Sequence, residues 1–418
     1  MDAAATLARL HRRAGFGLTP ADLDAAIARG VDTEIARLVS PASAGVAPAA
    51  DAWAGVDLTY DKGQAAATAV TLADGWLNRM IATPRPLEER MAWFWHGHFV
   101  SALSKVRYPV SMVTQIRLFQ QRGLGSFVDL VRAVTVDPAM LIYLDGTTST
   151  GTHPNENYGR ELLELFTLGR GNYTEADVQA GAAALTGWHV VRTDLSQSAF
   201  TTARHDPTPQ RYLGTTGVHD ADTVVATVTS HPACAPFVAG KIARAVIGPD
   251  VSASTVASLA STFARSGLSV AALVSATLHE LARGTDGGAV VTDPVTWLVM
   301  AQRATAAPLD AKVRASALRA AGQLPLYPPN VGGWPGGGAW YGTATVVARF
   351  DLASAIANAA PAANAAVQAA AAADSAALSR ALGLPAPFGA ETSAALAKVA
   401  DAPSRLVIAL TSPEFVLA

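Results

Sequence analysis

Helix start and stop signals recur along most of this chain, and this feature constrains its fold most. Thr19 can cap a helix that has Pro20 at its first position, an amphipathic body and a closing Gly30. Similar patterns predict helices at 66–82, 86–95, 109–121, 125–135, 157–168, 175–186, 220–230, 232–246, 253–265, 268–281, 293–305, 309–321, 343–359, 390–400 and 403–411. Only 188–216 alternates polar with apolar residues and predicts a short β-hairpin. We therefore expect a mainly α, multi-helix globular bundle with a short β-hairpin insertion and long functional loops.

The domain organisation follows from length and from the position of the irregular segments. A chain of 418 residues without a repeat of fixed period is not a solenoid. We expect a main helical domain at 1–345, with the candidate site in loops 144–156, 188–216 and 324–342. Residues 346–418 are expected to form a C-terminal helical segment that packs on this domain.

Composition and charge exclude several classes of partner. The net charge is −2 and the basic residues are scattered, which argues against nucleic acid. No window offers the ~18 uninterrupted apolar residues that a membrane span needs. Cys234 is the only cysteine, so a metal would need His and carboxylate ligands. The first residues lack the features of a secretory signal, so a cytoplasmic location is expected, with export by another route left open.

One predicted helix concentrates charge in a chain of which only 15% is charged. Glu156, Arg160 and Glu164 recur every fourth residue and share one helix face, and Glu161 lies beside it. The face could be a solvated stripe in which both outer acids pair with Arg160. Alternatively, Glu161 and Glu164 could share a metal ion, or act as acid and base if burial separates their pKa values. Arg160 could then clamp an anionic substrate group.

A second candidate site is the segment Trp95-His96-Gly97-His98-Phe99. Its two imidazoles would face the same side only if the helix from Pro86 ended near Trp95, and Gly97 makes such an end plausible. The pair could then bind a divalent metal or supply a general base. The alternative is a packed turn of aromatic and histidine residues.

Further candidates lie in the loops. His205 and Asp206 could contribute a ligand or an orienting pair, or form only a turn before Pro207. The glycine-rich loop with Trp334 and Trp340 lacks the ending of a phosphate-binding P-loop. Its rings could form a platform for sugars, or could pack inward as a cap.

With these motifs the chain resembles the bacterial "domain of unknown function 1800" family over nearly its whole length. The resemblance rests on ordered segments, namely 12–17, 95–99, 137–140, 154–169, 173–178, 186–188, 205–206, 328–334 and 412–415. It implies that the His-x-His pair, the acidic helix and the His-Asp pair belong to one recurring set. It also implies exported relatives, extracellular polymers and a neighbouring sulfatase-like or phosphatase-like protein. Relatives often have His where this chain has Phe166, so that position cannot be an essential ligand.

Three functional hypotheses follow. The leading one is a hydrolase of a polar, carbohydrate (glycosidic) substrate, and the alternatives are a non-haem-iron type oxidoreductase and a non-enzymatic helical binding partner. The candidate catalytic residues are Glu161, Glu164, Glu156, Arg160, His96 and His98. The candidate substrate-binding residues are Asn155, Asn157, Asp145, Trp188, His205, Asp206, Trp334 and Trp340. A divalent metal would be held by His96, His98, Glu161 and Glu164.

Overall fold

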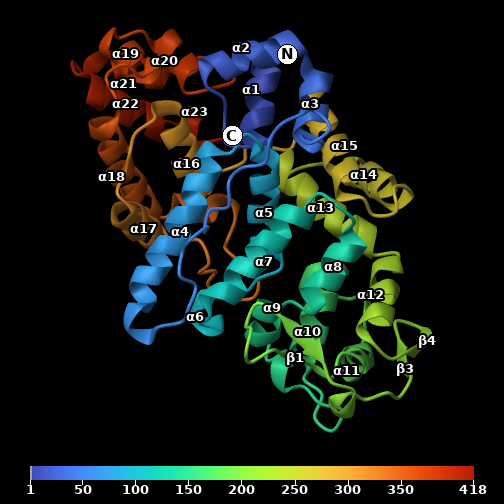
Figure 1. Ribbon diagram of the computed structural model, residues 1–418. Coiled ribbons are helices and arrows are strands. Elements are labelled where there is room, and N and C mark those ends of the chain that lie inside the picture. The colour runs from blue at the N-terminus through green and yellow to red at the C-terminus, as the bar shows by residue number, and fades with distance from the viewer. Residues whose placement is uncertain (1) are drawn as a thin grey trace.

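The computed structural model of the protein describes residues 2–418 and has the predicted mainly α architecture (Figure 1). Helices account for 61% of the chain, and the strands form only small antiparallel pairs. The helices of the first half are α1 (Ala3–Ala14), α2 (Pro20–Arg29), α3 (Val31–Val39), α4 (Ala65–Ala82), α5 (Pro86–His98), α6 (Leu103–Val106), α7 (Pro109–Arg122), α8 (Phe127–Thr135), α9 (Pro138–Tyr143), α10 (Glu156–Glu161) and α11 (Glu175–Ala184).

The second half continues the helical pattern. Its helices are α12 (Ala221–Ser230), α13 (Cys234–Val246), α14 (Ala253–Arg265), α15 (Val270–Ala282), α16 (Pro294–Thr305), α17 (Ala311–Ala320), α18 (Thr343–Ala359), α19 (Ala365–Ala371), α20 (Ser375–Ala381), α21 (Ala390–Lys398), α22 (Ala402–Thr411) and α23 (Pro413–Val416). None of the helices within residues 2–418 combines the length and the apolar character needed to span a bilayer.

Side-chain caps explain where many of these helices begin. Thr19 accepts a hydrogen bond from the backbone of Asp22, and Pro20 occupies the first position of α2. Thr174 and Asp177 form a reciprocal capping box at α11. Since these signals are local, the predicted helix starts agree closely with the structure.

The predicted hairpin region contains two hairpins instead of one. Strand β1 (Trp188–Val190) pairs antiparallel with β2 (Ser198–Phe200), and β3 (Gln210–Tyr212) pairs antiparallel with β4 (Thr215–Val218). Both lie beside α9–α12 at the edge of the molecule farthest from the chain ends (Figure 1). Tyr212 of β3 and Val218 of β4 are buried and join the hydrophobic core that the helices form.

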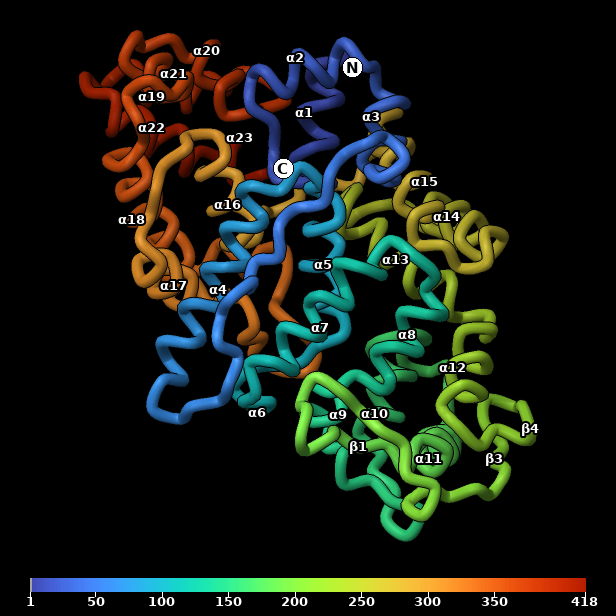
Figure 2. Tube along the Cα trace, in the orientation of Figure 1, coloured from blue at the N-terminus to red at the C-terminus, as the bar shows by residue number. Residues whose placement is uncertain are grey.

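The C-terminal segment packs against the end of α1. The blue α1 and the red C-terminal segment lie together in Figure 2, and the buried Arg12 donates to the carbonyl oxygen of Phe415 over 2.7 Å. Leu417 also forms a β-bridge with Val291. In the C-terminal segment, α18 packs against α16, α17 and α22. Helix α5 lies in the middle of the fold (Figure 1), where it packs against α1, α3 and α7.

Candidate functional site

Helix α5 does not end near Trp95, as the chelating arrangement would require, but continues through His98. Gly97 is accommodated inside the helix, and the backbone N–H of Phe99 still donates to the carbonyl of Trp95 over 2.7 Å. Residues two apart in a helix point to different sides. The expectation that His96 and His98 face the same side is therefore wrong.

His96 lies in an aromatic cluster. Its ring centroid is 5.4 Å from that of Trp76 and 5.3 Å from that of Trp334, and the side chain is fully buried. Burial lowers its pKa to about 3, so the imidazole is neutral at physiological pH. Neither ring nitrogen has a hydrogen-bond partner among residues 2–418. His96 is therefore packed among aromatic rings, which was the alternative to a metal ligand.

The acidic helix changes its winding halfway. After α10 the chain forms a π-helix at 162–167, in which the hydroxyl of Thr167 donates to the carbonyl of Leu162. Within α10, before the π-helix begins, Arg160 pairs with Glu156 over 3.1 Å, as predicted, and it also pairs with Glu175. Glu164 instead accepts from Arg170 over 2.6 Å and from the hydroxyl of Tyr173 over 2.8 Å. The expected Arg160–Glu164 pair is absent from the ion pairs of the described chain because the extra residue per turn alters their spacing.

The acids at 161 and 164 have different environments. Burial, and secondarily the charge of Glu164, raises the pKa of Glu161 above the usual value. Hydrogen bonds from Tyr173 and Arg170 lower the pKa of Glu164. Two neighbouring carboxylates whose pKa values are pushed apart can divide the roles of acid and base.

His98 connects this helix to the centre of the protein. Its Nε2 lies 2.9 Å from the carbonyl oxygen of Phe166, which makes Nε2 the protonated nitrogen. Its Nδ1 faces the Nζ of Lys241 at 3.4 Å, and the same Nζ donates to the carbonyl of Leu165 over 3.0 Å. Burial first, and then the Lys241 charge, holds the pKa of His98 well below its usual range. Both ring nitrogens are thus engaged, and the imidazole is neutral.

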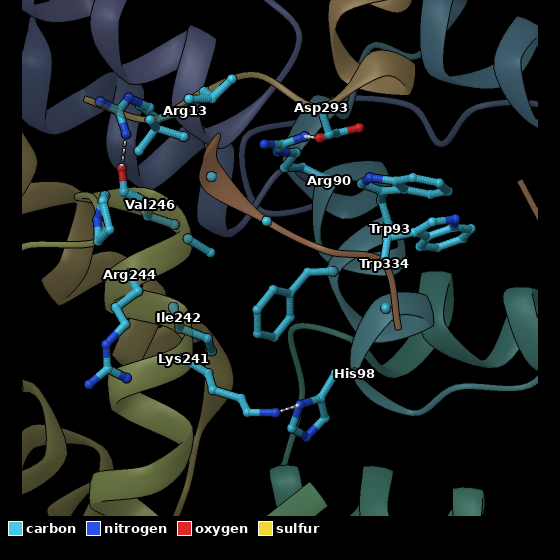
Figure 3. A pocket seen from close by; sticks show the side chains of 18 of the residues that line it. Arg13, Arg90, Trp93, His98, Lys241, Ile242, Arg244, Val246, Asp293 and Trp334 are labelled. Carbon is cyan, nitrogen blue, oxygen red and sulfur yellow. Dashed lines mark hydrogen bonds and ion pairs between the residues drawn. The ribbon is translucent and has the colours of Figure 1, made fainter. Parts of the chain in front are cut away.

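Lys241 and His98 line a cavity of about 550 Å³ (Figure 3). Its walls come from the end of α1, from α5, from the C-terminal half of α13, from residues 289–293 and from the loop 334–340. The volume lies in the range of small-molecule binding sites. Segments that are widely separated in the sequence, between residues 13 and 340, therefore build one site.

The cavity is rich in positive charge. Its cationic lining residues are Arg13, Arg90, Lys241 and Arg244, and its carboxylate is Asp293. Asp293 lies 3.6 Å from Arg90 and is thus already paired, as Figure 3 shows. Burial lowers the pKa of Arg13 to about 9 and that of Lys241 to about 8. Both remain charged at neutral pH, so the cavity carries an excess of cations.

An aromatic wall faces these cations. The ring of Trp334 stacks on that of Trp93 at 4.9 Å, and both line the cavity together with Phe94 and Trp340. The glycine-rich loop packs its tryptophans inward, as the cap interpretation predicts, and the same rings line the cavity. Gly333 approaches α5 so closely that an added Cβ would lie 2.5 Å from the carbonyl oxygen of Gly97. Its φ of 84° also favours glycine.

The polar candidates before the acidic helix gather at its beginning. Asn155 caps α10 by accepting from the backbone of Asn157 over 2.9 Å. The side-chain amide of Asn157 donates to Asp145 over 3.3 Å, and Asp145 also pairs with Lys105. Asn155 is therefore a helix cap, and Asn157 and Asp145 belong to a hydrogen-bond and ion-pair network at the surface.

The candidates from the hairpin region have structural partners. His205 contacts the backbone carbonyl of Thr186 through Nδ1 over 3.0 Å, and Asp206 accepts from the backbone of Thr208 over 2.9 Å. Trp188 packs on Phe200 at 5.5 Å between ring centroids. The contacts of His205 and Asp206 are those expected if the two residues form only a turn before Pro207.

The four expected metal ligands do not form a ligand group. No cluster of three or more His, Cys, Asp or Glu side chains within residues 2–418 is arranged to hold a metal ion. Of all sequence-predicted site residues, the cavity contains His98, Trp334 and Trp340. The missed residues are its cations. Lys241 gave one weak signal, as a charge in the otherwise apolar run that begins α13.

A comparison with models of protein families finds a family that matches this chain. The family described as "Protein of unknown function (DUF1800)" matches residues 9–417, essentially the whole chain. No curated protein and no solved structure matches the chain.

Proposed function

We propose that this chain, which belongs to the DUF1800 family of unknown function, binds an anionic small molecule with a flat or ring-shaped body in the central cavity. The excess of cations in that cavity is the observation that carries the proposal. Arg13, Lys241 and Arg244 have no carboxylate partner among the ion pairs of residues 2–418, and Asp293 is committed to Arg90.

Electrostatics supports an anion as the ligand. Taking a cation out of water is unfavourable unless opposite charge is nearby, and the lowered pKa values of Arg13 and Lys241 express this cost. A carboxylate, sulfate or phosphate group in the cavity would offset it. Arginine also offers paired N–H groups that suit such anions.

The aromatic wall supports a ligand with a ring. Trp93, Trp334 and Trp340 present flat surfaces that suit sugar and aromatic rings. An acidic, sulfated or phosphorylated sugar combines the two features. Such a ligand also agrees with the carbohydrate hypothesis and with the sulfatase-like neighbour that the family resemblance implies.

Binding of a charged probe and its neutral counterpart tests the proposal. We expect naphthalene sulfonate to quench tryptophan fluorescence and to bind at least about tenfold more tightly than naphthalene methanol, with affinity falling as salt is added. Arg244→Gln should weaken binding about fivefold, whereas Arg265→Gln on the exposed end of α14 should not change it.

A steric variant locates the site. A Cβ added at Gly97 meets no heavy atom within 4 Å, and this residue lines the cavity. Gly97→Leu should therefore fill the cavity and abolish probe binding, and Gly97→Ala should weaken it less, with both far-ultraviolet circular dichroism spectra unchanged. Equal affinity for the two probes, or binding that survives Gly97→Leu, would contradict the proposal.

A second candidate function, hydrolysis of a carbohydrate, has its own supporting observation. Glu161 and Glu164 are three residues apart, and their pKa values are shifted in opposite directions. In this reaction Glu161 would be the general acid and Glu164 the base or nucleophile. The acids lie outside the residues that line the cavity, so this function does not depend on anion binding there.

Release of reducing ends from neutral and acidic polysaccharides tests this candidate. Glu161→Gln should lower the rate on the order of a hundredfold or more, and the exposed Glu175→Gln serves as the matched control. A rate that survives both Glu161→Gln and Glu164→Gln would refute the carboxylate mechanism. The redox alternative has less support, because its four ligands do not meet within the described chain.

A further inference from the structure

We propose that Lys241 is a reactive amine that condenses with the carbonyl group of an aldehyde or ketone bound in the central cavity. The proposal rests on the proposed function for the anionic character of the ligand, and adds a carbonyl group to it.

The hydrogen bonds of Lys241 orient its nitrogen. A neutral amine has two N–H groups and one lone pair. The carbonyl oxygen of Leu165, at 3.0 Å, and the Nδ1 of His98, at 3.4 Å, provide one acceptor for each N–H. The lone pair is then left for the cavity, which Lys241 lines.

His98 is held in the form that this arrangement needs. Its Nε2–H is committed to the carbonyl of Phe166, so Nδ1 carries the lone pair that faces Lys241. The π-helix contributes both carbonyl acceptors, Leu165 and Phe166, from consecutive residues. One buried imidazole and two backbone carbonyls of the π-helix therefore hold this amine in place.

Burial makes the charged form of the Lys241 amine less favourable than it is in water. Lys241 forms no ion pair with a carboxylate within residues 2–418, and burial alone accounts for its lowered pKa. Its Nζ lies 4.9 Å from the ring centroid of Phe237, a cation–π contact that keeps part of the amine protonated. The other charged groups of the cavity are Arg13, Arg90, Arg244 and Asp293, of which the last is paired. Burial lowers the pKa of Lys241 to about 8, so a substantial fraction is nucleophilic near neutral pH.

The reaction needs no redox partner. The lone pair of Nζ forms a bond to the carbonyl carbon, and the carbon–oxygen π electrons move to oxygen. A proton passes from nitrogen to that oxygen, giving a hemiaminal. Loss of water then leaves an imine between Lys241 and the ligand. The arginines would hold the anionic group of the same molecule.

Reductive trapping tests the proposal with the exposed lysines as internal controls. The protein is incubated near pH 7.5 with formylbenzoate and cyanoborohydride, and the secondary amines formed are mapped by peptide mass spectrometry. We expect Lys241 to be modified on the order of a hundredfold faster than an ordinary lysine amine. The comparison sites are Lys62, Lys105, Lys312 and Lys398. Even labelling of all lysines, or an unmodified Lys241, would overturn the proposal.

Two competitors separate this proposal from anion binding. Benzoate should protect Lys241, and neutral benzaldehyde should label it more slowly than formylbenzoate. Naphthalene sulfonate binding without an adduct at Lys241 would refute only the reactive amine. Selective labelling that benzaldehyde matches and benzoate does not block would refute only the anion site. In Lys241→Arg the selective adduct should disappear while the labelling of the exposed lysines is unchanged.

Discussion

The Nε2 of His98 lies 2.9 Å from the carbonyl oxygen of Phe166, and this contact joins helix α5 to the end of the acidic helix. The same imidazole faces Lys241 and lines the cavity. Through His98 the charged helix and the cavity become neighbours without sharing a set of catalytic side chains. His98 holds the backbone carbonyl of Phe166 and the amine of Lys241 in place.

Replacement of His98 should therefore cost stability. In His98→Leu, the carbonyl of Phe166 and one N–H of Lys241 lose their partners inside the protein. We expect the free energy of unfolding in urea to fall by about 2 kcal/mol. His219→Leu, at an exposed loop position, should change it by less than about 0.5 kcal/mol. Equal stability of the two variants would contradict the assigned role of His98.

Removal of Trp334 should both destabilise the protein and weaken ligand binding. The ring stacks on Trp93 and contacts His96, and it is half-buried. We expect Trp334→Ala to lower the free energy of unfolding by about 2 kcal/mol, below the cost for a fully buried tryptophan. Tyr341→Ala is the control, because its ring is 49% exposed. Naphthalene sulfonate binding should weaken in the first variant only.

The helical fold was largely predictable because its signals are local. Caps such as Thr19 and Thr174 fix helix starts within a few residues. The winding of 162–167 was not predictable, since a π-helix depends on contacts such as those of Lys241 and His98 with its last carbonyls. Those contacts come from distant parts of the chain.

The candidate site was predictable only in part. His98 was a candidate because of the His-x-His segment, and Trp334 because of the glycine-rich loop with its tryptophans. Both residues line the cavity. Arg13 and Lys241 did not stand out, because a single cation in a helix is ordinary without knowledge of what packs against it. The charge-rich segment 155–165 had the clearest sequence signal of a site, yet Arg160 forms ion pairs near the surface with Glu156 and Glu175.

The buried carboxylate of Glu34 should make the free energy of unfolding depend on pH in the acidic range. Glu34 is fully buried and accepts from His11 and Arg29, and these partners lower its pKa to about 2, against the effect of its burial. Its contribution is present above about pH 4.5 and is lost as the pH falls through about 2.

Comparison of wild type with Glu34→Gln measures that contribution. At pH 7 the variant should be less stable by about 3 kcal/mol in urea unfolding, and the difference should shrink below pH 4.5. Glu391→Gln, at an exposed position, should show no such difference. A gap between wild type and Glu34→Gln that is independent of pH would refute the ion-pair origin of the effect.

Asp137 should produce the opposite pH dependence. It caps α9 and accepts from Gln115, but burial raises its pKa to about 7. The folded state then holds a proton that the unfolded state releases, so this residue lowers stability as pH rises from about 3.8 to 7.

Asp137→Asn should remove this slope. The asparagine oxygen can still cap α9, and the amide of Gln115 can rotate to accept from the new amide. Relative to the variant, wild type should lose about 1.4 kcal/mol of unfolding free energy per pH unit in that window. The exposed Asp129→Asn should follow wild type. Parallel pH profiles for Asp137→Asn and wild type would contradict the raised pKa.

Arg12 and Arg13 are consecutive residues of α1 that contact different parts of the protein. Arg12 holds the C-terminal segment through the carbonyl of Phe415, while Arg13 lines the cavity and donates to the carbonyl of Val246. One turn of α1 therefore contacts both the C-terminal segment and the wall of the cavity. If a ligand in the cavity strengthens the docking of residues 413–417 through this turn, reciprocity requires that docking strengthen ligand binding by the same factor.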